Sequence, residues 1–359
     1  MRLEAILREA RAGLASATAR VAAVLGAALV LVLVTTGIDR LVTAQSVDRA
    51  FEFQARGGAV QVVSAPGGID GSRCEGLSRL DGVSSAGALS HLDGRRASAA
   101  VLPDAPFALP RVTPAFVDVL GGRRPSAVGI VLSAELADAT ELVPGDALHL
   151  VVGGSTRPSP TVVAILDVPA DVHRAGLGYS ALDVAPSSGV FDECWVEVWP
   201  PDPNLRPMLF LSVSQGASSE APVIEQLVPR LGDGTAIAGA YGERITRGAP
   251  ALLLTGALAL GFFSVRLRRT ELSSARHAGV SAVDVLAVVL AETMVWASSV
   301  GLLAVACSTA VMASVDQLAN GARAGLVDAA VLVLGVIVGA TAGCLTVRER
   351  DFARYSRDR

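Results

Sequence analysis

Four stretches of the chain are apolar enough to cross a membrane. The first, Val21 to Ile38, contains no charged residue, and neither does the second, Gly248 to Val265. The third starts near Ala282 and continues past Ala306, and the fourth covers Leu326 to Val347. A helix needs about 20 apolar residues to cross the hydrocarbon core, whereas an average globular helix has about 11 to 12 residues. We therefore predict transmembrane helices rather than buried helices of a soluble protein.

The spacing of these stretches predicts a multi-pass α-helical membrane protein with four transmembrane helices and a large α/β extracytoplasmic domain between helices 1 and 2. Along the chain we expect an amphipathic N-terminal helix (1–20), transmembrane helix 1 (21–43), the extracytoplasmic domain (44–246) with an inserted β subdomain at about 110–170, transmembrane helix 2 (247–266), a cytoplasmic loop (267–281), transmembrane helix 3 (282–312), a short external loop (313–325), transmembrane helix 4 (326–347) and a tail (348–359).

A cleaved signal peptide is the alternative interpretation of the first apolar stretch. Val42, Thr43 and Ala44 resemble a small-residue cleavage site. However, about twenty residues precede the apolar stretch, and Ala44 lies well beyond its end, which is unusual for such a peptide. We expect the stretch to be retained as an anchor.

The distribution of arginine predicts the orientation. All 30 basic residues are arginine. The two terminal segments and the loop 266–281 together carry 13 arginines and six acidic residues, whereas residues 39–248 carry 16 arginines and 24 acidic residues. Short arginine-rich segments stay on the cytoplasmic side. The pattern therefore predicts a cell-membrane protein with both termini in the cytoplasm and an acidic domain outside.

Two of the four cysteines, Cys74 and Cys194, lie in the predicted external domain. An oxidising exterior favours a disulfide between them, and closing a loop of about 120 residues would remove several kcal/mol of unfolded-state entropy. Two buried free thiols are the alternative. Cys307 and Cys344 lie in the apolar stretches and are expected to serve as small packing residues.

The sequence of the external domain predicts two groups of short strands and helices. In the first, Ala59–Ser64 and Gly82–Leu89 are predicted strands that flank a helix over Gly71–Leu80. In the second, we expect strands at Cys194–Pro200 and Met208–Val213 and then a helix over Ala221–Leu231. The two groups can form one split α/β sheet.

The residues show no catalytic or metal-binding arrangement. The four histidines are scattered, no cysteines have metal-ligand spacing, and a Walker A lysine cannot exist in a chain without lysine. We expect a non-catalytic subunit that binds no cofactor, metal or nucleic acid itself.

Four phrases follow one another in the external domain: VTPAFVDVLGGRRP (112–125), VLSAELADA (131–139), PGDALHL (144–150) and TVVAILDVP (161–169). In this order they resemble the extracytoplasmic domain of MacB/FtsX-type ABC transporter permeases. Ala164-Ile165 replaces the usual Gly-Ile or Gly-Val, and the chain lacks the fused nucleotide-binding domain of MacB.

The cytoplasmic loop is similar to a second signature of the same family. It reads RLRRTELSSARHAGVSAVDVLAVVLAE over 266–292, and His277 and Ala278 depart mildly from the family pattern. The resemblance implies a coupling helix that rests in a cleft of an ATPase; a basic helix lying on anionic lipid headgroups is the alternative. The matching positions that would carry ATPase coupling are Arg268, Arg269, Glu271, Arg276 and Gly279.

Glu292 is a carboxylate several residues inside the third apolar stretch. Such a residue is costly in a membrane unless it faces a bundle interior, a partner helix or water. We favour a structural role at a helix or dimer interface over a place in a proton relay or substrate path.

The resemblance implies a permease subunit that works as a homodimer or heterodimer with a separate ABC ATPase, which binds the ATP. ATP-driven movement of the coupling loop would then move the external domains, by mechanotransmission, for export or envelope work. Membrane lipid and an extracytoplasmic protein are further expected partners. Two alternatives remain: a non-transporting regulator that activates a cell-wall hydrolase or sensor kinase, and a stand-alone membrane-anchored scaffold.

Overall fold

The computed structural model of the protein describes residues 18–91, 96–152, 155–156, 159–168, 170–171, 176–214 and 221–347. The chain divides into two compact units. One combines Met1–Asp48 with Ala240–Arg359, and the other is Arg49–Gly239. The first contains the membrane helices and the second is the extracytoplasmic domain. The predicted N-terminal helix and tail lie almost wholly outside the described residues.

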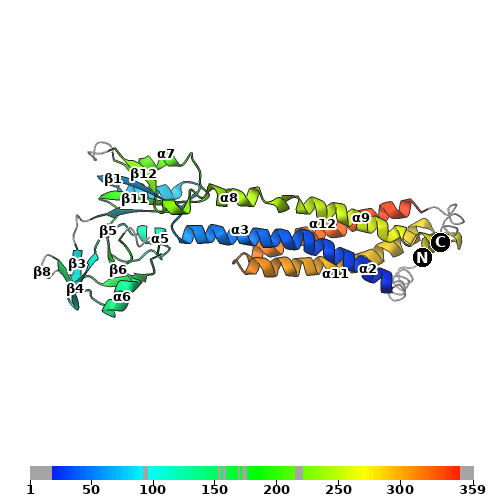
Figure 1. The fold of residues 1–359 in the computed structure, drawn as a ribbon, viewed down its shortest axis with the longest axis horizontal. Coiled ribbons are helices and arrows are strands. Elements are labelled where there is room, and N and C mark those ends of the chain that lie inside the picture. The colour runs from blue at the N-terminus through cyan, green and yellow to red at the C-terminus, as the bar shows by residue number, and fades with distance from the viewer. Residues whose placement is uncertain are drawn as a thin grey trace. The chain divides into compact units, whose positions relative to one another are not determined.

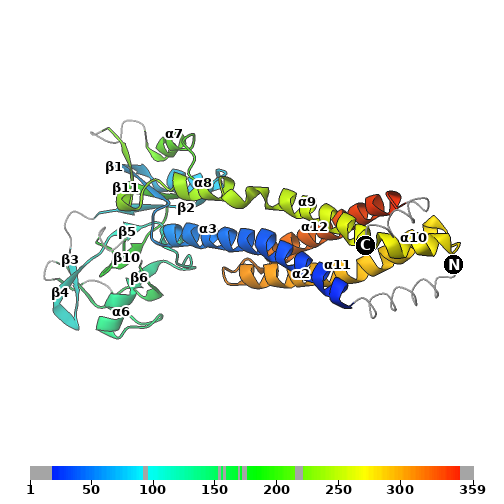
Figure 2. The ribbon, with the colours of Figure 1, turned by 45° about the vertical axis from the view of Figure 1, so that its right-hand side comes forward.

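In the part of the membrane unit that the structure describes, four helices are long and apolar enough to span a bilayer. This confirms the predicted class of a four-helix membrane protein with a mixed α/β domain between helices 1 and 2. Figures 1 and 2 show α9 and α12 side by side, with α11 along the other side of α12. The helical segments are α2 (Thr18–Val32), the π-turn η1 (Leu33–Gly37), α3 (Ile38–Ala55), α8 (Thr235–Gly242), η6 (Ile245–Gly248), α9 (Ala249–Arg266), α10 (Arg269–His277), α11 (Ala282–Ala313) and α12 (Leu318–Leu345).

Two of the helices extend beyond the predicted membrane spans. The first helix does not end at residue 43 but continues to Ala55, because the polar sequence that follows the apolar stretch still forms regular helix. The last helix begins at Leu318 rather than at 326, which leaves a connection of four residues after α11 instead of a loop over 313–325. Apolarity locates the part of a helix that crosses hydrocarbon, whereas the helix itself continues into water.

Glycines allow α9 and α12 to pack backbone against backbone. A Cβ atom at Gly339 would collide with the carbonyl oxygen of Leu258, and one at Gly261 would collide with that of Val336. A Cβ at Gly335 would lie 2.8 Å from the side chain of Ala257. Small residues that permit such close approach are a main source of helix association in lipid. The pair α9–α12 is therefore held by a fit that few side chains could replace.

The extracytoplasmic domain is built on two sheets. The main sheet has eight strands in the order β12-β1-β11-β2-β5-β10-β6-β9, and the smaller one has the order β4-β3-β7-β8. The expected split α/β arrangement is present, because β11 lies between β1 and β2 and is antiparallel to both. The strands are β1 (Val60–Asp70), β2 (Val83–Ser90), β3 (Arg96–Ala99), β4 (Leu102–Ala108), β5 (Arg111–Val112), β6 (Gly129–Ser133), β7 (Leu150–Val152), β8 (Ser155–Thr156), β9 (Val162–Leu166), β10 (Ala181–Val184), β11 (Val190–Val198) and β12 (Val223–Gln226).

Short helices cover both faces of the main sheet, and one of them carries the disulfide. Cys74 in α4 is bonded to Cys194 in β11, with the two Cα atoms 5.8 Å apart, and both cysteines are fully buried. This confirms the predicted pairing. The carboxylate of Asp70 caps α4 by accepting a hydrogen bond from the amide of Arg73 at 3.0 Å. The short helices are α4 (Gly71–Gly76), η2 (Leu77–Arg79), α5 (Phe116–Val119), α6 (Ala134–Thr140), α7 (Arg206–Leu209), η4 (Phe210–Ser212) and η5 (Pro229–Leu231).

Three predictions for this domain are wrong. The expected strand at Met208–Val213 is the helical pair α7 and η4, because Pro207 occupies the first turn of α7. The expected helix at Ala221–Leu231 is largely strand β12, which pairs with β1 along Ser64 to Gln61. The inserted subdomain at about 110–170 is not separate, since β5, β6 and β9 belong to the main sheet. The alternation of apolar and polar residues that marks β12 as a strand is hard to recognise in the sequence, because the apolar residues of 221–231 also fit the period of a helix.

Candidate functional site

The segment after the second membrane helix forms the short helix α10. It starts at Arg269, with two residues between it and the end of α9, and its Leu272 and Ser273 are buried. The chain then turns at Gly279, whose φ of 94° is in the left-handed region that glycine adopts without strain. Ser281 caps the next helix, α11, by accepting a hydrogen bond from the amide of Asp284 at 3.1 Å. The sequence predicted this helix–glycine–helix order.

Arg268 lies in the break between α9 and α10 and forms an ion pair with Glu292 of α11. Its guanidinium also donates a hydrogen bond to Glu271 at 3.3 Å. The Glu292 side chain is only 9% exposed, whereas that of Arg268 is 26% exposed. A structural role for Glu292 at a helix interface is consistent with this ion pair, which joins two segments of one chain. Each residue was singled out from the sequence, but their pairing was not, because nothing in the sequence gives the path of the chain back to α11.

Two further contacts attach α10 to the membrane helices. Arg276 donates a hydrogen bond to the carbonyl oxygen of Val347, just beyond α12, at 2.9 Å. Leu272 packs in a buried cluster with residues of α9, α11, α12 and the segment just beyond α12, namely Val265, Val285, Val289, Ala340 and Val347. Of the residues predicted to carry coupling, Arg268, Glu271 and Arg276 thus meet at this attachment. Arg269 starts the helix and Gly279 ends it.

The outward side of the same region combines polar and apolar side chains. Glu271, Ser274 and His277 are exposed on α10. Two aliphatic side chains flank the helix: Leu267 is 68% exposed and Val283 is 75% exposed. Glu271, Ser274 and His277 follow one another at a spacing of three residues, which places them on one side of the helix. We call these three residues the outer face of α10.

A second charged cluster lies in the membrane unit where the first apolar stretch ends. Asp39 accepts hydrogen bonds from Arg40 and Arg244, each at 3.0 Å, and Arg40 also donates to Asp328 of α12 at 2.6 Å. The side chains of Asp39 and Asp328 are 5% and 6% exposed. Asp328 lies near the start of the fourth apolar stretch, but the sequence does not reveal its partners. Two acids and two arginines make the cluster neutral overall, which is the usual condition for buried charge.

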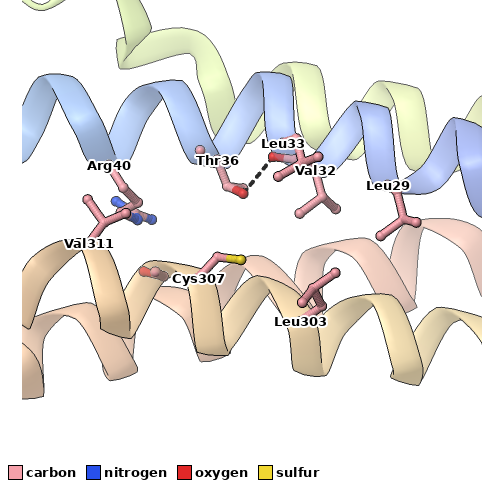
Figure 3. Close-up of a pocket in the computed structure, with 10 residues that line it drawn as sticks. Leu29, Val32, Leu33, Thr36, Arg40, Leu303, Cys307 and Val311 are labelled. Carbon is pink, nitrogen blue, oxygen red and sulfur yellow. Dashed lines mark hydrogen bonds between the residues drawn. The ribbon is translucent and has the colours of Figure 1, made fainter.

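An apolar groove runs from this cluster between the first helix and α11 (Figure 3). Figure 3 shows Arg40 at one end of the groove and Leu29 and Leu303 at the other. The hydroxyl of Thr36 donates to the carbonyl oxygen of Val32 at 2.7 Å and so presents little polarity to the groove. Its lining is completed by Leu33, Gly37, Cys307, Ser308 and Val311.

The extracytoplasmic domain contains a polar cluster around His91 and Glu193. Within the described residues, no group of three or more histidine, cysteine, aspartate or glutamate side chains could hold a metal ion. His91 lies 3.1 Å from Glu193, whose other carboxylate oxygen accepts from the indole of Trp195 at 2.7 Å. The hydrogen bond to Glu193 raises the pKa of His91, and neighbouring carboxylates add to this effect. The cluster is a local pH-sensitive contact.

Comparisons with solved structures find similar chains. One is the periplasmic region of MacB from Actinobacillus actinomycetemcomitans, with 12% identity, 49% of this chain and 92% of that chain covered, and a TM-score of 0.34. Another is a domain of a putative permease protein from Porphyromonas gingivalis, with 15% identity, coverage of 48% and 91%, and a TM-score of 0.28. No protein-family model matches the chain, and no curated protein matches it. This chain is therefore similar over about half its length to solved regions of MacB and of a permease protein.

Proposed function

We propose that this protein is the permease subunit of an ABC transporter, and that a separate ATPase subunit docks on the outer face of α10. The observation that carries the proposal is the attachment of α10 by the Arg268–Glu292 ion pair. A helix that only rests on lipid headgroups needs no buried ionic contact with a membrane helix. A helix that transmits force needs a stiff contact with the membrane helices that it moves.

The attachment points specify how a movement would be transmitted. A displacement of α10 acts on α11 through Glu292 and on the end of α12 through Arg276. The apolar cluster around Leu272 joins α9 to the same body. Since α9 and α12 are packed backbone against backbone, the helices would tilt together rather than slide past one another.

In the proposed complex, the chain itself performs no chemistry. The ATPase subunit binds and hydrolyses ATP, and closure of its dimer moves two copies of α10 from the cytoplasmic side. Both termini of this chain lie in the cytoplasm, as the arginine distribution indicates. The movement reaches the extracytoplasmic domain, which acts on cargo or on an envelope partner. The sequence motifs of the MacB/FtsX type support this arrangement.

The proposal is tested by site-specific photo-crosslinking in native membranes. A benzoylphenylalanine residue replaces exposed Ser274 on the outer face of α10. The matched control carries it at Val295 in α11, which is 55% exposed but lies in the middle of an apolar helix. We expect an ATP-binding-cassette protein, identified by mass spectrometry, to be captured at 274 and not at 295.

A functional measurement completes the test. The captured ATPase is purified with and without this protein, and ATP hydrolysis is measured with both in one nanodisc. We expect the intact protein to change the hydrolysis rate and the Ser274→Trp variant to abolish the change by blocking the outer face. Capture of lipid alone at 274, or equal capture at both positions, would overturn the proposal.

A further inference from the structure

Two segments connect the membrane unit to the extracytoplasmic domain. The first is α3, which starts in one unit and ends in the other, and the second is the return segment 226–248, which contains η5, α8 and η6. We infer that ion pairs join these two connections at both of their ends, so that they transmit movement as one body. The inference concerns this chain alone and goes beyond the proposed docking of an ATPase.

In the membrane unit, the joining residue is Asp39 at the start of α3. It accepts a hydrogen bond from Arg244 of the return segment at 3.0 Å. Arg244 is itself fixed, because it donates to the carbonyl oxygen of Tyr241 at 2.7 Å and lies over the Tyr241 ring at 4.3 Å. The Asp39 side chain is 5% exposed and that of Arg244 is 16% exposed, so water screens this pair weakly.

In the extracytoplasmic domain, the joining residue is Asp171. Its carboxylate accepts a hydrogen bond at 2.6 Å from Arg56, the residue after α3. The other oxygen of the same carboxylate forms an ion pair with Arg230 of η5, in the return segment. Only 12% of the Asp171 side chain is exposed. One carboxylate therefore holds the domain ends of both connections.

Uncharged contacts also hold the domain ends of the two connections in place. Phe53 of α3 packs against Trp199, with ring centroids 5.6 Å apart. Gly234 of the return segment packs against these two rings. Its φ is +74°, and a Cβ there would lie 2.8 Å from the Phe53 ring. The amide of Gln226 donates to the carbonyl oxygen of Gly58 at 2.7 Å, which ties β12 to the end of the first connection.

These contacts differ from ordinary surface ion pairs in what they join. Arg56 also pairs with Glu52 at 3.4 Å, but that contact lies inside α3 and Glu52 is 65% exposed. Such i,i+4 pairs add little to stability, and this one does not link α3 to the return segment. Removal of Asp171 or Asp39, in contrast, would break an ionic contact that links one connection to the other. Glu52 therefore provides a matched control on the same arginine.

The test is hydrogen–deuterium exchange on the full-length protein in nanodiscs, without nucleotide or ATPase. We expect Asp171→Asn to speed amide exchange about tenfold or more in both 50–58 and 228–240, the scale set by loss of a hydrogen bond to a charged group. Asp39→Asn should act on both connections as well, and Arg244→Gln provides a milder variant of the same pair. Glu52→Gln should change neither segment by more than about twofold.

The outcomes decide the inference independently of the proposed function. Faster exchange in both connections for Asp171→Asn, with Glu52→Gln unchanged, supports it. A change confined to one connection, or equal effects of Asp171→Asn and Glu52→Gln, overturns it. Because no ATPase is present, failure of photo-crosslinking at position 274 does not alter either result. Circular dichroism and gel filtration confirm that each variant is folded.

Discussion

Removing the two halves of the Arg268–Glu292 pair should have unequal effects on stability. Glu292 is 9% exposed and its partner in the ion pair is Arg268, whereas Arg268 is 26% exposed and also contacts Glu271. Arg268→Gln therefore leaves a buried carboxylate without its counter-charge, which costs about 3–5 kcal/mol. Glu292→Gln leaves an arginine that still reaches Glu271 and water, so its cost should be about 1–2 kcal/mol.

The double variant Arg268→Gln/Glu292→Gln separates the pair from its surroundings. With no buried charge left, it should recover at least about 2 kcal/mol relative to Arg268→Gln alone, and the double-mutant cycle should show a clear coupling energy. The free energy of unfolding is measured by reversible denaturation in mixed micelles, followed by tryptophan fluorescence, since Trp296 lies one turn from Glu292 on α11. The reasoning is refuted if Glu292→Gln costs as much as Arg268→Gln, or if the two effects add.

Three further outcomes follow from packing, covalent topology and titration. Gly339→Ala should cost about 1–3 kcal/mol in the same unfolding assay because its Cβ meets backbone, whereas Gly26→Ala, with open space around it, should not destabilise. Cys74→Ser should lower the free energy of unfolding of the extracytoplasmic domain by about 2–5 kcal/mol, as measured by urea denaturation with and without reductant. The raised pKa of His91 means that its bond to Glu193 stabilises the fold below the unfolded pKa, and that this contribution disappears as the pH rises through the folded pKa. Wild type and His91→Ala should therefore differ in thermal stability at pH 5.5, by less than about 1 kcal/mol for this exposed pair, and converge at pH 8.5.

Features that depend on local composition could be predicted from the sequence. The four membrane helices follow from long apolar stretches, since a single segment in hydrocarbon can satisfy its own backbone hydrogen bonds only as a helix. The disulfide followed from the predicted external location of Cys74 and Cys194. The turn after α10 followed from Gly279, whose backbone conformation most residues avoid.

Features that depend on distant contacts could not be predicted. Arg268 and Glu292 are 24 residues apart, and Arg40 and Asp328 are 288 residues apart. Only the packing of the helices brings each pair together. The strand β12 was missed for a related reason: Val223 to Gln226 pair with β1 across more than 150 residues, and that ladder outweighs a helical preference that short segments express weakly.

The disulfide also determines the covalent connectivity of the external domain. The chain between Cys74 and Cys194 contains the whole of the smaller sheet and most strands of the main one. A single cut anywhere in that interval leaves both fragments linked, so each membrane helix keeps its hold on the domain until the bond is reduced. A protease site or affinity tag could therefore be inserted at an exposed turn there, such as the one at Gly145, and its cleavage would separate the protein only on a reducing gel.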